Sequence, residues 1–236
     1  MAEAMLGEAS DVSRVLFVAD YNSAAVAIRS AYQTQGQIWT LVVPKADVIP
    51  DLFTPDEAAR LLADGAMKLD WAGCQSEKAA IILTAVGAYQ LVEVLRASFR
   101  LSERGAPHSV VYMLEPGRFR APRSDGEREH AALDHLKAAL YPDSAPARVF
   151  VTHTRPEPLM GALQPLHTGS GKTVALGFMN QGGTLSTPGM LFLNRCSWAH
   201  VVDASAGALG LPREDLLTPE ELAALDGAVS PEGVIV

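Results

Sequence analysis

Residues Gly177–Met190 read G-F-M-N-Q-G-G-T-L-S-T-P-G-M and join a predicted buried strand, Val174–Phe178, to a predicted helix that opens at Pro188. A polar loop between a strand and a helix is typical of the crossovers in α/β proteins. Adjacent Gly182 and Gly183 let the backbone take positive φ, so that main-chain N–H groups can converge on one point. The same turn carries four hydroxyl or amide side chains: Asn180, Gln181, Thr184 and Thr187. We expect this loop to recognise a ligand or to lock a subunit contact.

The rest of the chain repeats this alternation of short β-branched runs with longer amphipathic ones, which predicts a sheet with crossover helices. The predicted strands are Val15–Val18, Ile38–Val43, Ala79–Ala85, Ser109–Met113, Val149–Thr152 and Val174–Phe178. The predicted helices are Ser23–Gln33, Pro55–Ala63, Ala88–Leu101, Glu127–Leu140, Pro158–Leu163 and Pro188–Leu209. Thr54 and Thr218 each precede proline and two carboxylates, which is typical of capped helix starts. Gly65 and Gly227 fit the matching ends.

The spacing of these elements predicts an α/β fold with a three-layer, mostly parallel sheet, preceded by a partial βαβ unit. Residues 1–45 form the βαβ unit, and residues 46–78 form a connector that carries the Thr54 helix. Residues 79–211 form the main domain. Residues 212–236 form a short docking helix and tail.

Composition excludes several classes of function. The 236 residues are 48% hydrophobic and 19% charged, with a formal net charge of -8, so that the chain is expected to fold as a soluble globule. The acidic balance argues against binding to nucleic acid or to anionic membranes. Two cysteines cannot build a disulfide framework, and the first residues lack the pattern of a secretory signal. We therefore expect a cytoplasmic protein.

Two local motifs resemble catalytic ones. Residues Thr168–Thr173 read T-G-S-G-K-T, but Leu166 stands where a phosphate-binding loop needs glycine and a strand follows where a helix is required, so this motif is interpreted as a turn. Cys196 and His200 lie four residues apart on a predicted helix and could form a thiolate and base. The helix is apolar on most sides, which favours a buried structural cysteine. No group of His, Cys and carboxylate residues has metal-ligand spacing.

Charged residues at strand ends are candidates for ligand binding. Lys45 and His153 each follow a predicted strand, and parallel sheets place their ligands at the carboxyl ends of strands. Arg155 could add an anion donor beside His153. The alternatives, a surface lysine and a partly buried structural histidine, remain open. A loop in Pro116–Ser124 carries three arginines, which suit either an anion or a solvated or subunit contact: Arg118, Arg120 and Arg123.

Several of these motifs occur in one order along the chain: L-V-V-P-K (41–45), T-P-D-E-A (54–58), D-G-A-M-K-L-D-W-A-G (64–73), I-I-L-T-A-V-G (81–87) and the loop of Gly177–Met190. In that order and spacing, residues 15 to 195 resemble the carboxyl-terminal part of phosphoketolases, which are thiamine-diphosphate enzymes of the transketolase superfamily. The resemblance implies that residues 1–45 match the end of a pyrimidine-binding domain. It assigns Lys45, Trp71, His153 and the Gly182–Pro188 loop to family motifs.

The chain departs from the family pattern at several of these motifs: Ala46, Gly73, Thr154, Asn180 and Gln181. It also has no counterpart of the family's histidine-rich stretch after the fourth strand. The family's diphosphate-binding domain, with its metal-binding motif, lies upstream of the matched region and has no counterpart here. The resemblance therefore implies no cofactor in this chain, and thiamine diphosphate with Mg²⁺ in partner subunits.

Three hypotheses follow. The first is a non-cofactor-binding subunit of a split phosphoketolase- or transketolase-like enzyme. Its partners would carry the diphosphate- and pyrimidine-binding domains, and homodimerisation would be a further contact. Lys45, His153 and Arg155 would contact substrate, and the loop from Asn180 to Thr187 would be structural or interfacial. The second is a regulatory module that binds a small anion at the sheet edge. The third is a self-contained enzyme that uses Cys196 and His200.

Overall fold

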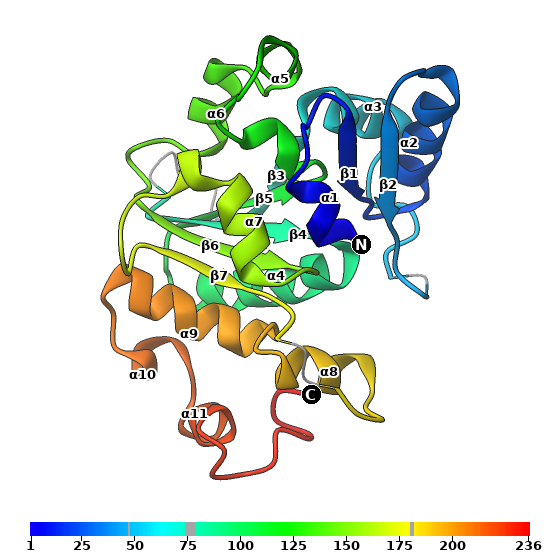
Figure 1. Ribbon diagram of the computed structural model, residues 1–236. Coiled ribbons are helices and arrows are strands. Elements are labelled where there is room, and N and C mark those ends of the chain that lie inside the picture. Colours follow the sequence, from blue (N-terminus) through cyan, green and yellow to red (C-terminus); the bar gives the residue numbers. More distant parts are fainter. Residues whose placement is uncertain (47, 74–78, 180–181) are drawn as a thin grey trace.

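The computed structural model describes residues 1–46, 48–73, 79–179 and 182–236 and contains two sheets (Figure 1). Two parallel strands, β1 (Ser13–Phe17) and β2 (Ile38–Val42), form the smaller sheet. The larger sheet has the order β3-β5-β4-β6-β7. Its strands are β3 (Ala66–Gly73), β4 (Ile81–Val86), β5 (His108–Met113), β6 (Ala147–Thr152) and β7 (Thr173–Leu176). All its pairings are parallel except that of β3 with β5. The predicted α/β fold, a mostly parallel sheet preceded by a partial βαβ unit, is confirmed.

The described helices alternate with these strands as predicted, with one more before β1 and the last four after β7. They are α1 (Ala2–Leu6), α2 (Tyr21–Gln33), α3 (Pro55–Asp64), α4 (Ala88–Glu103), α5 (Asp125–His130), α6 (Asp134–Leu140), α7 (Pro156–Ala162), α8 (Thr187–Leu193), α9 (Trp198–Leu209), α10 (Arg213–Leu216) and α11 (Pro219–Leu225). Two 3-10 turns, η1 (Pro116–Phe119) and η2 (Gln164–Leu166), complete the described elements. Thr54 and Thr218 both form capping boxes, and Gly65 ends α3 with φ 81°. None of the described helices has the length and apolar character needed to cross a bilayer.

The structure differs from the sequence prediction at β3, which lies within the predicted connector. Its residues alternate irregularly between buried Leu69 and exposed side chains such as Trp71, and the register with β5 shifts between Lys68 and Gly73. An edge strand with such a register shift does not show the strict alternation of apolar and polar residues that identifies a strand in a sequence, so the sequence did not predict it.

Two predicted helices are each divided in two. The predicted Glu127–Leu140 helix breaks at Ala131, whose extended backbone ends α5. The predicted Pro188–Leu209 helix breaks between α8 and α9, where Arg195 adopts φ 57°, in the left-handed region. A non-glycine residue rarely adopts that conformation, and it interrupts the helix.

Both faces of the large sheet are covered, which makes three layers. On β4, Ile81, Leu83 and Ala85 pack into one core with α4 and α9. Ile82 and Val86 pack into a second core with α7 on the other face. Figure 1 shows α9 and α7 on opposite sides of the sheet. A strand that is buried on both faces reads as a continuous apolar run, which explains I-I-L-T-A-V.

A buried ion pair fastens the β1–β2 unit to the large sheet. Arg14 on β1 donates two hydrogen bonds to Glu115, just after β5, at 2.8 and 2.6 Å. Arg118 and His130 also donate to this carboxylate, at 3.0 and 2.9 Å. Burial alone would raise the pKa of Glu115, but the hydrogen bonds from Arg14 and His130 and the nearby arginine charges outweigh it and hold the pKa at about 2. The buried carboxylate thus accepts four hydrogen bonds, and two of them join Arg14 and Glu115, which are 101 residues apart in the sequence.

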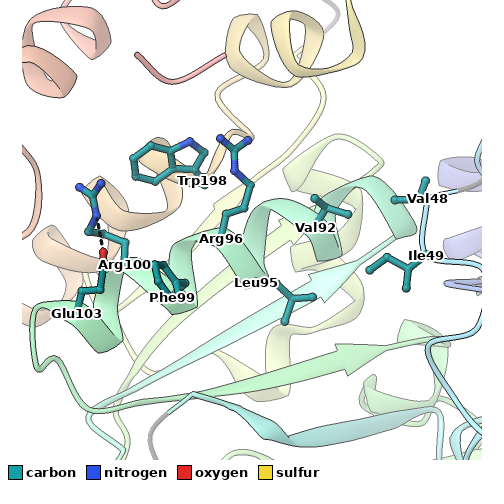
Figure 2. Close-up of a pocket in the computed structure, with 9 residues that line it drawn as sticks. All are labelled: Val48, Ile49, Val92, Leu95, Arg96, Phe99, Arg100, Glu103 and Trp198. Atoms are coloured by element: carbon teal, nitrogen blue, oxygen red, sulfur yellow. Dashed lines mark ion pairs between the residues drawn. The ribbon is translucent and has the colours of Figure 1, made fainter. Parts of the chain in front are cut away.

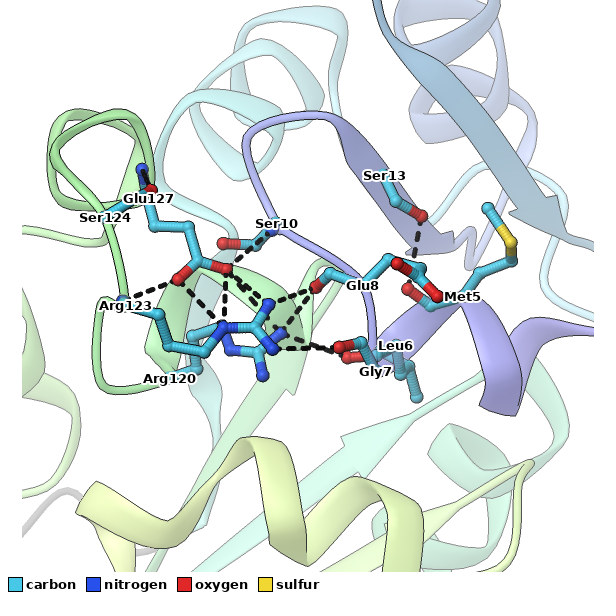
Figure 3. A network of polar contacts seen from close by, with 10 residues as sticks. All are labelled: Met5, Leu6, Gly7, Glu8, Ser10, Ser13, Arg120, Arg123, Ser124 and Glu127. Atoms are coloured by element: carbon cyan, nitrogen blue, oxygen red, sulfur yellow. Dashed lines mark hydrogen bonds and ion pairs between the residues drawn. The ribbon is translucent and has the colours of Figure 1, made fainter.

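The three arginines of the Pro116–Ser124 loop have structural partners, and Figure 3 shows those of Arg120 and Arg123. Arg120 donates to the main-chain oxygen of Glu8 at 2.7 Å and Arg123 to that of Gly7 at 3.0 Å, just after α1. Arg123 also binds Glu127 at 2.7 Å, and Arg118 binds Glu115. The loop therefore holds the amino-terminal helix in place, and these arginines are occupied by contacts within the chain.

We predict that Glu115→Gln lowers the free energy of unfolding by about 3 kcal/mol at pH 7, because the folded-state pKa lies below the ordinary value of about 4.3. A carboxylate whose pKa is lowered in the folded state stabilises the fold at pH values above its unfolded-state pKa. This stabilisation is lost as the pH falls toward 2. The variant should therefore lose less stability than the original chain between pH 5 and pH 2, as measured by urea unfolding. The variant should still lose some stability at low pH, because the hydrogen bonds of Glu127 with Arg123 also lower the pKa of Glu127 to about 2. An identical acid dependence in the two proteins would contradict the assignment.

Candidate functional site

The strand order creates a crevice at the carboxyl ends of β4 and β6. From β4 the chain continues through α4 to β5 on one side, whereas β6 pairs with the other side of β4. The helices α4 and α7 that follow β4 and β6 pack on opposite faces of the sheet. Such a topological switch point is where open α/β sheets bind ligands. A cavity of about 430 Å³ lies at this place. Its lining residues are Lys45, Tyr89, Gln90, His153, Phe178, Leu185, Thr187, Met190, Leu191, Asn194 and Cys196.

The cavity brings together two of the three predicted substrate residues. Lys45 follows β2 and is exposed, and its neighbour Ala46 donates a main-chain hydrogen bond to the Tyr89 hydroxyl at 3.3 Å. Among the described residues, no side chain pairs with the Lys45 ammonium group. His153 follows β6, and its main-chain N–H bonds to the carbonyl of Val86 at 3.0 Å. Desolvation lowers the pKa of His153 below its ordinary value.

Arg155 lies outside this cavity and is already paired. Its guanidinium binds the carboxylate of Glu3 at 2.6 and 2.9 Å, and its main-chain N–H binds the same carboxylate at 2.8 Å. These bonds fasten α1 to the start of α7 across 152 positions of sequence. The sequence suggested an anion donor, but in the structure the anion is the chain's own Glu3.

The glycine-rich loop contributes one edge of the cavity. Thr187 lines it, whereas Gly182, Gly183 and Thr184 are exposed, and Gly183 does not adopt the predicted positive φ. The predicted loop residues Asn180 and Gln181 lie outside the described residues. Ser186, rather than a residue singled out from the sequence, caps α8 by accepting a hydrogen bond from the Gly189 N–H at 3.2 Å.

Sequence reasoning missed Gln90. Its side chain is 4% exposed, and among the described residues its amide oxygen has no hydrogen-bond partner. Gly87, with φ 122°, precedes α4, and a Cβ there would collide with that oxygen and press on the Cβ of His153. The signal in the sequence was a glycine between a strand and a helix, V-G-A-Y-Q.

The other motifs are structural. The Thr168–Thr173 segment forms the predicted turn before β7, with Gly169 and Gly171 at positive φ. Lys172 donates to the carbonyl of Ala208 at 3.1 Å, so it is held at the end of α9. Within the described ranges, no group of three or more His, Cys, Asp and Glu side chains could hold a metal ion.

Cys196 and His200 do not form a nucleophile and base. Cys196 precedes α9, and its thiol lies 3.3 Å from the carbonyl oxygen of Asn194. Burial, with the charge of Glu93, raises the pKa of this thiol to about 12. The His200 ring bonds to the Ser197 hydroxyl at 2.7 Å, and burial lowers its pKa to about 4. The thiol is therefore protonated at neutral pH, which favours the structural interpretation.

A second concave surface lies on the outer side of α4. This groove, of about 760 Å³, is lined by Val48, Ile49, Val92, Leu95, Arg96, Phe99, Arg100, Glu103 and Trp198 (Figure 2). Phe99 is 67% exposed. The guanidinium carbon of Arg100 lies 4.9 Å from the centre of the Trp198 ring. The surface is broad and mostly apolar, and the charged groups at its border are paired within the chain.

Comparison with solved structures identifies the fold. A transketolase from Pichia stipitis in complex with sedoheptulose 7-phosphate matches 84% of this chain with a TM-score of 0.62 and 18% identity. Transketolase from Leishmania mexicana matches the same share with a TM-score of 0.62 and 13% identity. The match covers only 25% of either transketolase. A split-gene transketolase described as an inactive beta4 tetramer matches with a TM-score of 0.53 and 18% identity, over 57% of its own chain.

The chain therefore has the fold of the carboxyl-terminal region of transketolases and spans about a quarter of the length of those full enzymes. A scan against known protein families found no match. A search of curated proteins also found none. The predicted resemblance to the transketolase superfamily is confirmed at the level of the fold.

The raised thiol pKa predicts that Cys196 resists alkylation. In a Cys74→Ser variant, Cys196 should not react with a thiol reagent at pH 8 in the native protein, and should react fully in guanidinium chloride. The physical reason is twofold: burial excludes the reagent and keeps the sulfur protonated. Rapid stoichiometric labelling of the native variant would show a reactive thiol and revive the catalytic interpretation.

Proposed function

We propose that this chain is the non-cofactor-binding subunit of a split thiamine-diphosphate-dependent enzyme of the transketolase or phosphoketolase kind. The split-gene transketolase supports the proposal, because a fold shared with this chain occurs there in a subunit of a divided enzyme. In this scheme the diphosphate- and pyrimidine-binding domains, thiamine diphosphate and Mg²⁺ belong to partner subunits. The cofactor would supply the carbanion chemistry, and this chain would complete the assembly.

The observation that carries the proposal is the open edge of β2. In the parallel ladder, the main-chain N–H and C=O groups of Ile38, Thr40 and Val42 point toward β1. The main-chain groups of Trp39 and Leu41 therefore point away from β1, toward the open edge. Among the described residues, no strand pairs with that edge. Parallel sheets are normally covered and larger than two strands. An unpaired parallel edge invites a further strand from another chain.

Exposed apolar side chains support the same interpretation. Ile38, the first residue of β2, and Val43, just after its last residue, are 54% and 56% exposed. The groove on the outer side of α4 offers a second apolar surface (Figure 2). Large apolar surfaces on one chain are typical of docking sites. A partner that adds a strand beside β2 would cover the first of them, and the second would suit another subunit or a second copy of this chain.

Within such an assembly, Lys45 and His153 would contact substrate. Lys45 has no described ion-pair partner, and it extends from the end of β2, next to the proposed interface. Arg155 serves a structural ion pair with Glu3, and we assign it no substrate contact. The loop from Gly182 to Thr187 would border the same cavity or an interface.

Affinity purification of the chain from its native host, followed by mass spectrometry, should recover a transketolase-like protein that carries the cofactor domains. The double variant Ile38→Lys and Val43→Lys should weaken that complex at least about tenfold, because two charges would be buried against the added strand. Tyr32→Lys, at a residue 90% exposed on α2, is the matched control and should assemble normally. Recovery of an unrelated partner, or equal assembly by all variants, would refute the proposal.

The isolated chain should not bind thiamine diphosphate with Mg²⁺, because the proposal assigns the domain that grips the diphosphate and metal to the partner. Titration calorimetry of the full chain should give no heat of binding at cofactor concentrations that saturate the purified complex. The complex serves as the positive control. Tight binding by the chain alone would mean that it carries a cofactor site of its own, against the proposed division of labour.

A further inference from the structure

We propose that the cavity at the switch point binds a small organic anion whose phosphate or carboxylate group is joined to a compact apolar body. All of its lining residues belong to this chain, so binding there can be measured without the proposed partner. Its volume of about 430 Å³ falls in the range of small-ligand pockets. The inference names a ligand class that differs from the polyhydroxylated sugar phosphates suggested by the fold.

The anion would lie at the amino terminus of α4. This helix has 16 residues. Its N-cap is Gly87, which has no side chain to accept hydrogen bonds from the first main-chain N–H groups. Within the described part of the chain, no acceptor takes the main-chain N–H groups of Ala88, Tyr89 and Gln90. These free donors and the helix dipole favour a negative charge. Lys45 at the rim adds a full positive charge, and none of the lining residues is acidic.

Gln90 is a second, independent sign of a ligand. A buried amide oxygen without a partner costs about 1–3 kcal/mol, so such groups normally have a donor in the functional state. The oxygen lies against Gly87 at the wall of the cavity. Because a Cβ at position 87 would collide with this oxygen and crowd the Cβ of His153, only glycine lets Gln90 and His153 pack so closely against the start of α4. A donor group beside the anion, or a water that it orders, would satisfy Gln90.

The apolar lining residues determine the rest of the ligand. They are Phe178, Leu185, Met190 and Leu191, and Phe178 and Leu185 are 37% and 50% exposed. A sugar would lose hydrogen bonds with water against these side chains, whereas an aromatic or branched aliphatic group would gain from burial. The cavity therefore pairs an anion grip with an apolar wall.

Titration of the full-length chain, followed by NMR or calorimetry, tests this with three probes: phenyl phosphate, inorganic phosphate and ribose 5-phosphate. Phenyl phosphate should bind about tenfold more tightly than the other two, since partial burial of one ring contributes that much. Equal affinity for the three probes, or tighter binding of ribose 5-phosphate, would overturn the apolar-ligand assignment.

Substitutions of exposed residues test whether the ligand binds in this cavity. Lys45→Gln should weaken all three probes by a factor of about five or more, and Phe178→Ser should remove the preference for phenyl phosphate while leaving inorganic phosphate unchanged. Lys68→Gln, on β3 and outside this cavity, is the charge-matched control. Circular dichroism verifies the fold of each variant. If Lys45→Gln and Lys68→Gln weaken binding equally, the contact is unspecific charge and the proposal fails. Because the isolated chain is measured, this failure is distinct from failure to find a catalytic partner.

Discussion

The carboxylate of Glu115 is the contact on which the arrangement of the molecule depends. It is fully buried and receives hydrogen bonds from Arg14, Arg118 and His130. Arg14 belongs to the two-stranded unit and Glu115 follows β5, so this group joins the unit to the large sheet, together with the hydrogen bond from the Phe17 N–H to the Leu114 carbonyl at 2.8 Å. Because β2 leads directly to Lys45, the same ion pair sets where the lysine lies relative to the strand ends. Loss of a partner would leave an uncompensated charge inside the protein, which is strongly destabilising.

The position of the two-stranded unit decides which segments line the cavity. Four segments meet there: the residues after β2, the start of α4 after β4, His153 after β6, and lining residues between Phe178 and Cys196. The two strands of the large sheet are neighbours in a parallel ladder, whereas the β2 segment comes from the other sheet. The strand order makes the loops after β4 and β6 diverge, which opens a crevice. The β1–β2 unit then closes one side of it.

The molecule combines a complete core with incomplete edges. The large sheet is covered on both faces, and its central strand is buried throughout. The small sheet has only two strands, with an exposed Ile38 at the start of β2 and an exposed Val43 just after its end. A chain of this size can bury enough surface to fold, so the open edge is not a sign of an unstable domain. It is a surface whose main-chain groups remain available to another strand.

The sequence alone determined the α/β class, the six predicted strands and the capping boxes at Thr54 and Thr218, because these depend on residues only a few positions apart. It also placed Lys45 and His153 at strand ends. Only the tertiary structure decided that β3 pairs antiparallel with β5, that Arg155 binds Glu3, and that the amide oxygen of Gln90 has no hydrogen-bond partner in the described part of the chain. Each of these depends on segments far apart in the chain. Local periodicity carries no information on which distant strand, charge or helix end will lie alongside, because packing of the whole fold selects those neighbours.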